Sequence, residues 1–444
     1  MLENQKKKIL FISDHPLVPS GVGVQAKFLI EGLLRSSDEY SFVCLGGAIK
    51  HPDYTPQVVA PEIFGADRWK IIPVDGHGSK DILRSVLHAE RPTAVVIFTD
   101  PRFFHWLYEM EDEVRSFCPL LYWHVWDNDP LPTFNRPLYD STDHVVALSM
   151  KTYGMLRGMG YDRCSYIPHG LPHELFKPLP PDQVLDFKKK HYGPHAEREF
   201  VLMWNNRNAR RKQTGDVIEA FAGLAEEVGR DRVALFMHTQ AKDPEGQDIL
   251  ALAERFGVQK QLLLSQDRVP PETLNGMYNV ADCTINIASN EGFGLGTLES
   301  LFAGTPIVVH FTGGLQYQVG DWWNGLKDFT DQERLTAYAK KNYESGIGSW
   351  WGVPIFSSVR NCVGSQSVPW IYDDRCKKDD VVRALVKVFK MGPARRKEVG
   401  LRAREWAKRY FDVDDVVRSW DALIRTEIAR RAEFGPPTVR VVKI

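Results

Sequence analysis

The segment Asn290–Glu299 has residue types and spacing suited to a ligand that carries both hydroxyl and phosphate groups. It follows a short apolar run, is rich in glycine and leads into a helix-like pattern. Glycines let a ligand approach the backbone closely, and the free N–H groups of a helix start favour an anion such as a diphosphate. Glu291 and Glu299, about two helical turns apart, could bind hydroxyls on two parts of one ligand. The alternative is an ordinary helix start stabilised by acids.

A basic segment, Arg207–Lys212, follows the strand-like run Phe200–Trp204. Arg207 could hold a diphosphate through paired hydrogen bonds, and Lys212 could act on it as a compact positive charge. The alternative is a solvated basic loop. The later loop Ser265–Val269 is positioned to contribute to binding of a nucleotide base.

Two candidates lie in the first part of the chain. Gly21 and Gly23 stand in the first loop between a strand and a helix, where backbone N–H groups could bind a phosphate. Their spacing matches neither the dinucleotide-binding fingerprint nor a P-loop. His124 ends an apolar run, where a cleft residue belongs, although a lone histidine is more often structural. No cluster of residues has metal-ligand spacing, so we predict no metal and no cofactor.

Alternating strand-like and helix-like segments must position these residues. The first half predicts strands at 8–13, 94–99, 120–125 and 144–148 with a helix at 24–34, and the second half repeats the alternation from residue 200 to 310. Repeated strand–helix units predict parallel sheets with the site at their carboxyl ends. We expect an α/β protein with two doubly wound, Rossmann-like domains facing a cleft: residues 1–170 and 171–410, with an inserted subdomain at about 315–370. A helix and tail at 411–444 would pack back on the first domain.

Composition limits the range of functions. The chain has 444 residues, of which 43% are hydrophobic and 25% charged, with a formal net charge of -1. This is ordinary globular composition, without the positive field of a general nucleic-acid or membrane binder. The apolar runs are too short to cross a bilayer, no export signal is visible, and the six cysteines are scattered without a Cys-x-x-Cys pair. We therefore expect a cytoplasmic protein, with peripheral membrane contact left open.

In this order and spacing, these segments resemble a retaining glycosyltransferase of the GT-B fold, close to glycosyltransferase family four. Glu291 and Glu299 match the family's Glu-x7-Glu signature, and Arg207 and Lys212 match its Arg-x4-Lys pair. The glycine loop, His124 and the segments 167–170, 303–306 and 313–314 are further matches, although the family usually has asparagine at the position of His169.

The resemblance implies transfer of a hexose or pentose from a UDP-, GDP- or ADP-sugar to an acceptor hydroxyl. It implies that Glu299 binds the ribose and that Glu291 binds the sugar with backbone groups of residues 293–295. His124 would lie beside the reacting sugar. The groups implied for the catalytic centre are His124, Glu291, Arg207 and Lys212. Those implied for donor binding are Gly21, Gly23, Phe293, Gly294, Leu295, Thr297, Leu298 and Glu299.

The acceptor is less defined. The insertion is longer than the family's usual linker, and its tryptophans (Trp322, Trp323, Trp350 and Trp351) could stack an acceptor or form a small core. Residues 365–375 are similar to segments of glycosyltransferase-like proteins of bacteriophages and large DNA viruses. That similarity, with basic clusters at 207–212 and 395–409, suggests a hydroxymethylated pyrimidine in DNA as one acceptor. Glycan, lipid and small-molecule acceptors, a sugar-nucleotide epimerase and a non-catalytic sugar-nucleotide-binding protein are the alternatives.

Overall fold

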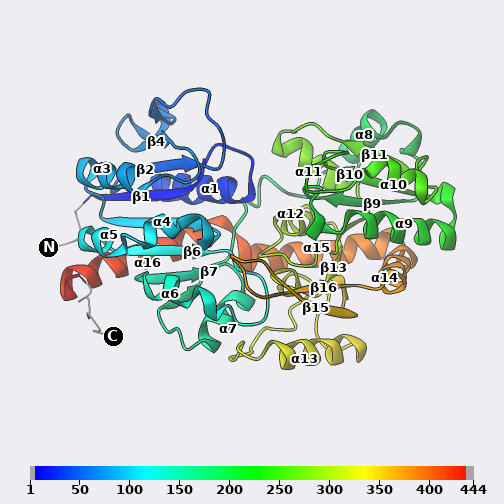
Figure 1. Ribbon diagram of the computed structural model, residues 1–444. Coiled ribbons are helices and arrows are strands. Elements are labelled where there is room, and N and C mark those ends of the chain that lie inside the picture. The colour runs from blue at the N-terminus through cyan, green and yellow to red at the C-terminus, as the bar shows by residue number, and fades with distance from the viewer. Residues whose placement is uncertain (1–5, 437–444) are drawn as a thin grey trace.

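The computed structural model describes residues 6–436 and has two lobes, each built on a largely parallel β-sheet flanked by helices (Figure 1). This confirms the predicted α/β class with two Rossmann-like domains. Long apolar runs form the central strands because both faces of each sheet are covered by helices.

The first sheet has the order β3-β4-β2-β1-β5-β6-β7-β8, parallel except for the pairing of β3 with β4. Its strands are β1 (Lys7–Asp14), β2 (Tyr40–Gly47), β3 (Gln57–Val58), β4 (Trp69–Pro73), β5 (Ala94–Thr99), β6 (Leu120–His124), β7 (His144–Ala147) and β8 (Cys164–Tyr166). Its helices are α1 (Gly21–Ser36), α2 (Pro61–Phe64), α3 (Lys80–Glu90), α4 (His105–Tyr108), α5 (Glu111–Phe117), α6 (Arg136–Asp140) and α7 (Met150–Gly158).

The second sheet is parallel throughout, with the order β11-β10-β9-β12-β13-β14. Its strands are β9 (Phe200–Asn205), β10 (Val233–His238), β11 (Leu262–Ser265), β12 (Cys283–Asn286), β13 (Ile307–His310) and β14 (Gly352–Ile355). The helices in this part of the chain are α8 (Pro181–Tyr192), α9 (Thr214–Val228), α10 (Ile249–Arg255), α11 (Pro271–Val280), α12 (Leu295–Ala303), α13 (Gln332–Glu344) and α14 (Lys378–Lys390).

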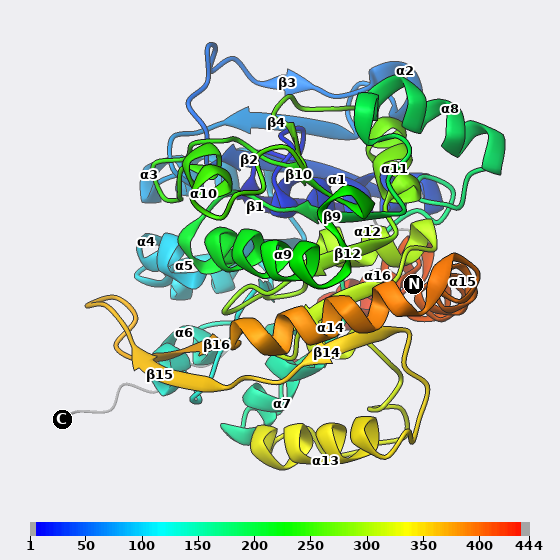
Figure 2. The same cartoon turned by 90° about the vertical axis from the view of Figure 1, so that its right-hand side faces the viewer.

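The region predicted as an inserted subdomain is not a separate unit. Its strand β14 pairs with β13 and completes the second sheet, and α13 follows a loop that packs on the main core (Figure 2). Trp322, Trp323 and Trp351 are buried in that core, and the rings of Trp323 and Trp351 contact Trp406. The acceptor-stacking interpretation is therefore wrong for these three side chains.

A two-stranded hairpin follows β14 and projects from the second domain (Figure 2). Its strands are β15 (Val359–Val363) and β16 (Ile371–Arg375), which pair in antiparallel fashion. The hairpin reaches the first domain, where Asn128 exchanges two hydrogen bonds with the backbone of Tyr372, at 2.6 and 3.0 Å. It therefore links the two domains beside the carboxyl ends of their strands.

Two long helices close the chain across both domains. Helix α15 (Gly392–Phe411) packs on α12 of the second domain, and α16 (Val413–Phe434) returns to pack on α1 of the first (Figure 1). Asp412 separates them and caps α16, since its carboxylate accepts a hydrogen bond from the Asp414 N–H. Residues 437–444 of the predicted tail lie outside the described residues.

Within residues 6–436, none of the helices combines the length and the apolar character needed to span a membrane.

Candidate active site

A cleft with a volume of about 720 Å³ lies between the domains and is lined by both of them and by the β15–β16 hairpin. It brings together, from the predicted site residues, Gly21, Arg207, Lys212, Glu291, Phe293, Gly294 and Leu295. The predicted residues Gly23, His124, Thr297, Leu298 and Glu299 do not line it.

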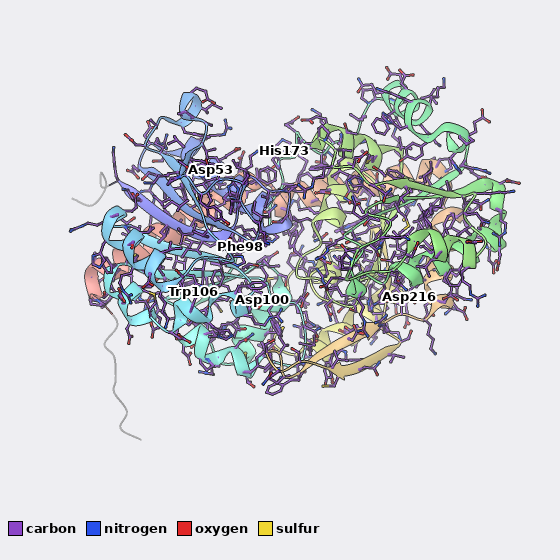
Figure 3. The ribbon with its side chains drawn as sticks, turned by 45° about the horizontal axis from the view of Figure 1, so that its top comes forward. Asp53, Phe98, Asp100, Trp106, His173 and Asp216 are labelled. Atoms are coloured by element: carbon purple, nitrogen blue, oxygen red, sulfur yellow. The ribbon has the colours of Figure 1, made fainter. Side chains whose placement is uncertain are left out.

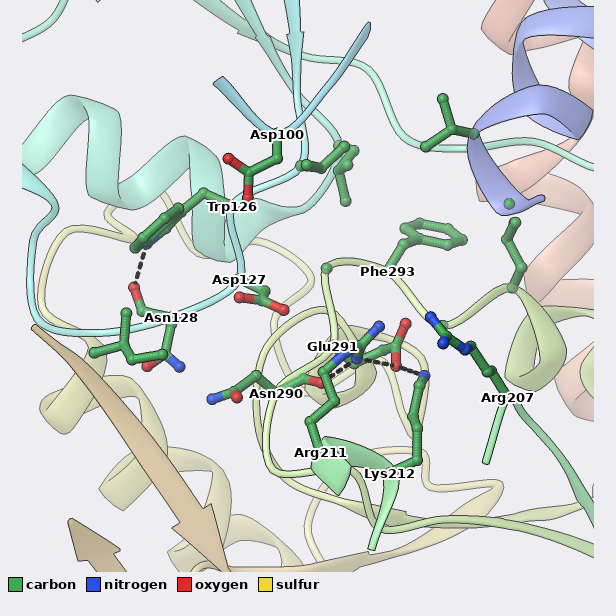
Figure 4. Close-up of a pocket in the computed structure, with 18 of the residues that line it drawn as sticks. Asp100, Trp126, Asp127, Asn128, Arg207, Arg211, Lys212, Asn290, Glu291 and Phe293 are labelled. Atoms are coloured by element: carbon green, nitrogen blue, oxygen red, sulfur yellow. Dashed lines mark hydrogen bonds and ion pairs between the residues drawn. The ribbon is translucent and has the colours of Figure 1, made fainter. Parts of the chain in front are cut away.

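The centre of the second-domain wall is an ion-pair cluster (Figure 4). Lys212 bonds to Glu291, and Arg211 bonds to the same carboxylate at 3.2 Å and to the Asn290 carbonyl at 2.9 Å. Burial by itself would raise the pKa of Glu291, but the charges of Lys212 and Arg211 outweigh it and hold that pKa below its usual value. Glu291 is therefore ionised at neutral pH. Arg211 was absent from the sequence prediction, although it lies inside the basic segment.

Arg207 belongs to the cleft but does not join this cluster. Its guanidinium forms two hydrogen bonds with the Asp243 carboxylate, at 2.9 and 3.1 Å. It also lines a smaller neighbouring hollow, together with Gln266, Asp267 and Arg268 of the loop after β11. Arg207 thus stands between the ion-pair cluster and the loop predicted to contribute to base binding.

The start of α12 offers an anion site beside the ion-pair cluster. Gly294 precedes the helix with φ +93°, and no side chain caps the first turn. The buried Thr297 hydroxyl in that turn has no hydrogen-bond partner within the described structure. Uncapped N–H groups and an unpaired hydroxyl are suited to phosphate oxygens. Leu298, in contrast, is fully buried in the core and serves packing.

Glu299 lies within α12, and one oxygen of its carboxylate is bonded to Tyr278. The Tyr278 hydroxyl donates to Glu299 Oε2 at 2.7 Å and accepts from the Asn205 amide at 2.7 Å. Burial raises the pKa of Glu299 to about 7, because the hydrogen bond from Tyr278 offsets only part of the lost hydration. No other hydrogen bond to this carboxylate is found among residues 6–436.

Gly313 and Gly314 pack closely against the backbone of the loop that carries Glu291. A Cβ at Gly313, where φ is +53°, would lie 2.1 Å from the Glu291 carbonyl oxygen. A Cβ at Gly314 would lie 2.4 Å from the Gly292 carbonyl, and the Gly314 N–H donates to Glu291 O at 2.8 Å. This contact explains the Gly313-Gly314 pair seen in the sequence: only glycine leaves room for two backbones to pack this closely.

The two glycines of the first loop differ in role. Gly21 begins α1 at the cleft, and a Cβ there would lie 3.3 Å from Leu295 of the second domain. The Gly23 N–H donates instead to the capping hydroxyl of Ser20 at 2.9 Å, and a Cβ at Gly23 would meet the His15 and Val18 carbonyls. Gly21 is therefore placed to face a ligand, whereas Gly23 is required for packing.

His124 is buried in the first domain and does not line the cleft, which disagrees with its predicted place beside the reacting sugar. The side chain is 1% exposed, with Nδ1 2.9 Å from the Tyr122 hydroxyl and Nε2 2.8 Å from the Tyr139 hydroxyl. Burial lowers its pKa to about 3, so the ring is neutral. The polar residues that follow β6 reach the cleft instead, because the chain leaves the sheet only after His124.

We expect His124→Ala to lower the free energy of unfolding by about 3 kcal/mol, because it opens a cavity and removes the His124 partner of the buried Tyr139 hydroxyl, whereas Tyr122 keeps its hydrogen bond to the Thr99 carbonyl. Since the folded pKa lies below the ordinary value of 6.5, the stability that His124 contributes is complete above pH 6.5 and is lost as the pH falls toward 3. Chemical denaturation at several pH values checks both points, with exposed His88→Ala as the control. A large loss of turnover in a stable, folded His124→Ala protein would contradict a structural role.

The first-domain wall carries carboxylates that sequence reasoning did not select. Asp14 ends β1, Asp100 follows β5 and Asp127 follows β6, and all three line the cleft. Figure 3 shows Asp100 nearer the second lobe than Trp106, which lies on the same domain. Their common position after neighbouring parallel strands was the signal that could have identified them. Arg102 is the cation of this wall, and it is bound to both oxygens of Asp100, at 2.9 and 2.8 Å.

The basic cluster at 395–409 lies elsewhere. It is part of α15, and none of its side chains lines the cleft. Arg396 binds Asp282 at 2.9 Å, and Arg404 binds backbone carbonyls of residues 173, 176 and 302. At least these two arginines hold the fold together.

Across residues 6–436, no three or more His, Cys, Asp or Glu side chains are grouped so as to hold a metal ion.

Comparison with known proteins agrees with this architecture. Residues 186–345 match the family model "Glycosyl transferases group 1". A D-inositol 3-phosphate glycosyltransferase from Corynebacterium jeikeium is 27% identical over 187 residues, which span 41% of this chain and 44% of that protein. The match therefore covers less than half of that relative.

Solved structures share the fold over nearly the whole chain. Sucrose-phosphate synthase from Thermosynechococcus elongatus has a TM-score of 0.70 at 15% identity, covering 96% of this chain and 100% of that one. Anabaena HepE, solved with UDP and glucose, has a TM-score of 0.66 at 14% identity, covering 95% and 100%. The chain thus has the GT-B fold, and its second domain carries the sequence pattern of group 1 glycosyl transferases.

Proposed function

We propose that this protein is a retaining glycosyltransferase that moves a sugar from a nucleotide-sugar donor to an acceptor hydroxyl. The observation that carries the proposal is the cluster of Arg211, Lys212 and Glu291 beside the uncapped start of α12. It places two cations, free N–H groups and a carboxylate on one wall of a cleft. A nucleoside diphosphate bearing a sugar has the complementary charges and hydroxyls.

In the proposed complex, Lys212 and Arg211 form ion pairs with the diphosphate in place of Glu291. The Glu291 carboxylate, released from these cations, then accepts hydrogen bonds from sugar hydroxyls. Arg207, Thr297 and the Gly21 loop would complete the diphosphate site, and Glu299 would bind the ribose. The smaller hollow beyond Arg207 would take the base.

The chemistry follows from this arrangement. The bond between the anomeric carbon and the diphosphate oxygen breaks, which builds positive charge on the sugar and negative charge on the leaving group. Fixed cations and N–H dipoles stabilise that negative charge. The acceptor hydroxyl attacks from the leaving-group face, forms the new C–O bond and passes its proton to the departing oxygen, so the anomeric configuration is retained.

A glycosidase would use two carboxylates on opposite sides of one glycosidic bond. Here Glu291 and Glu299 belong to one loop–helix unit and have different partners, two cations and a tyrosine. The pair therefore fits donor binding better than hydrolysis.

The first experiment measures nucleotide release from a panel of UDP-, GDP- and ADP-sugars, with and without candidate acceptors, followed by mass analysis of the products. Acceptor-dependent release with one sugar mass added supports the transferase. Conversion of a nucleotide sugar without an acceptor would favour an epimerase, and binding without conversion a non-catalytic protein. Duplex DNA with hydroxymethylated pyrimidines belongs among the acceptors, as do lipid vesicles and free sugars.

We expect affinity for the donor to increase as the pH rises. The carboxylate of Glu299 must be ionised to accept both ribose hydroxyls, and burial raises its pKa to about 7. Between pH 6 and 8 the ionised fraction grows about tenfold, so the Kd of an intact nucleotide sugar should fall about tenfold. Isothermal titration calorimetry measures this change, and Glu299→Gln should abolish it. The same raised pKa disfavours the folded state as the pH rises from 4.5 to 7, a decline in stability that Glu299→Gln should also remove.

A further inference from the structure

We infer that the acceptor is an uncharged polyhydroxyl compound, such as a sugar or a cyclitol, whose hydroxyls bind Asp127 and Asp100 on the first-domain wall. This inference rests on the proposed glycosyl transfer and names the class of acceptor. It excludes acceptors that bring a phosphate into the cleft, including a nucleotide of a DNA strand.

Charge on the first-domain wall carries the argument. Asp14, Asp100 and Asp127 face the cleft there, and Arg102 is the wall's cation. Both oxygens of Asp100 accept hydrogen bonds from the Arg102 side chain, so its charge is already neutralised. Asp14 is held by the Ser20 hydroxyl at 2.7 Å and lies 3.2 Å from His77. A phosphate on this side would therefore meet carboxylates, and among the described first-domain residues that line the cleft there is no unpaired cation to balance it.

Asp127 adds a half-buried carboxylate on the cleft wall that can accept hydrogen bonds from a ligand. No side chain or backbone group of residues 6–436 donates a hydrogen bond to its carboxylate. Figure 4 shows it between Trp126 and Glu291, at the centre of the pocket. Burial raises its pKa to about 6, and the nearby Arg211 only partly offsets this effect. At neutral pH it is an ionised acceptor without a partner, which a hydroxyl can satisfy and a phosphate cannot.

The third wall of the cleft contributes no charge. The tip of the β15–β16 hairpin lines it with Val363, Gly364, Ser365, Val368 and Ile371. Val368 packs with Trp126 and Met155, so this wall is a fixed apolar surface. Apolar side chains next to carboxylates suit the C–H faces and hydroxyls of a sugar.

The remaining cations of the cleft belong to the donor side. Arg211 and Lys212 pair with Glu291, and Arg207 pairs with Asp243, all on the second domain. The relative from Corynebacterium jeikeium is named for D-inositol 3-phosphate, a phosphate-bearing compound. If this cleft took such an acceptor, a free cation would be expected on the first-domain wall.

The test compares matched acceptors with the full-length protein and its donor. Each neutral compound is paired with its phosphate monoester: glucose with glucose 6-phosphate, fructose with fructose 6-phosphate, and myo-inositol with an inositol monophosphate. For whichever pair the protein accepts as substrates, we expect kcat/KM to be at least tenfold higher for the neutral compound than for its phosphate monoester. Asp127→Asn should lower kcat/KM for the neutral acceptor at least tenfold while leaving the Kd of the donor within twofold.

The Asp100→Asn variant tests whether charge on the first-domain wall sets this preference. It removes one negative charge and releases Arg102, so the preference for the neutral member should fall at least tenfold. Exposed Asp67→Asn, on the same domain, is the matched control and should leave the preference unchanged. Equal or better use of a phosphate monoester or of DNA by the unaltered protein would overturn the inference. The inference would also be overturned if the protein hydrolysed its donor but, in complex with the nucleoside diphosphate, bound neither the neutral compound nor the phosphate monoester of any pair.

Failure of the proposed function gives a different result. In that case no donor is bound or turned over, with water or with any acceptor. Loss of the charge preference alone, with donor turnover intact, concerns only the acceptor.

Discussion

Replacement of Lys212 by methionine is expected to lower kcat of sugar transfer by about a thousandfold. Lys212 is buried and bonds to Glu291 at the centre of the cleft, where the diphosphate of a donor would develop its charge. Methionine keeps most of the side-chain volume and removes the charge. The loss should appear in kcat because the interaction strengthens as the leaving group departs.

The Lys212→Met protein should remain folded, because Arg211 continues to neutralise Glu291. Thermal unfolding checks this, and Lys260→Met, at an exposed position of the same domain, is the control for removing a lysine charge. Steady-state nucleotide release, with product mass, measures the effect. A folded Lys212→Met enzyme with turnover within tenfold of the original would contradict the proposed role of the cluster.

Replacement of Gly313 by alanine is expected to lower kcat/KM at least a hundredfold without directly touching a substrate. The new Cβ would lie 2.1 Å from the Glu291 carbonyl oxygen, far inside contact distance. The Glu291 loop must therefore move, and a displacement of about 1 Å at a reacting group can cost a hundredfold in rate. The backbone strain of alanine at positive φ adds about 1 kcal/mol of destabilisation.

Gly325→Ala separates these two effects. Gly325 also has a positive φ, +82°, but nothing lies within 4 Å of its Cβ position. Its replacement should cost a similar strain and leave kcat/KM unchanged. Comparable activity losses in both variants, measured at equal folded fractions, would show that strain alone is responsible.

Much of the fold could be predicted because it depends on local pattern. The buried strand β5 was predicted with its observed bounds, since an apolar run of this length between polar residues admits few other structures. The start of α12 followed from its glycines in the same way. The region at about 315–370 was wrongly predicted to be an inserted subdomain. Its strand β14 is short, and only pairing with β13 makes it part of the second sheet.

The position of several second-domain residues at the cleft was predictable for a related reason. Arg207, Lys212 and Glu291 lie in the loops that follow the buried strands β9 and β12, so their position at the sheet edge follows from the strand pattern. Arg211 was missed because neighbours in a basic segment look alike in sequence, and only the backbone course after β9 decides which side chain reaches Glu291.

The sequence by itself determined the two-domain α/β architecture and predicted that Arg207, Lys212 and Glu291 of the second domain would meet at one cleft. Tertiary structure alone decided that His124 is buried between two tyrosines while Asp127, three residues later, faces the cleft without a hydrogen-bond partner in the described part of the chain. It also decided that the tryptophans at positions 322, 323 and 351 are part of the core and that the hairpin lines the cleft. The physical reason is that burial and charge balance are set by segments distant in sequence, which no local spacing records.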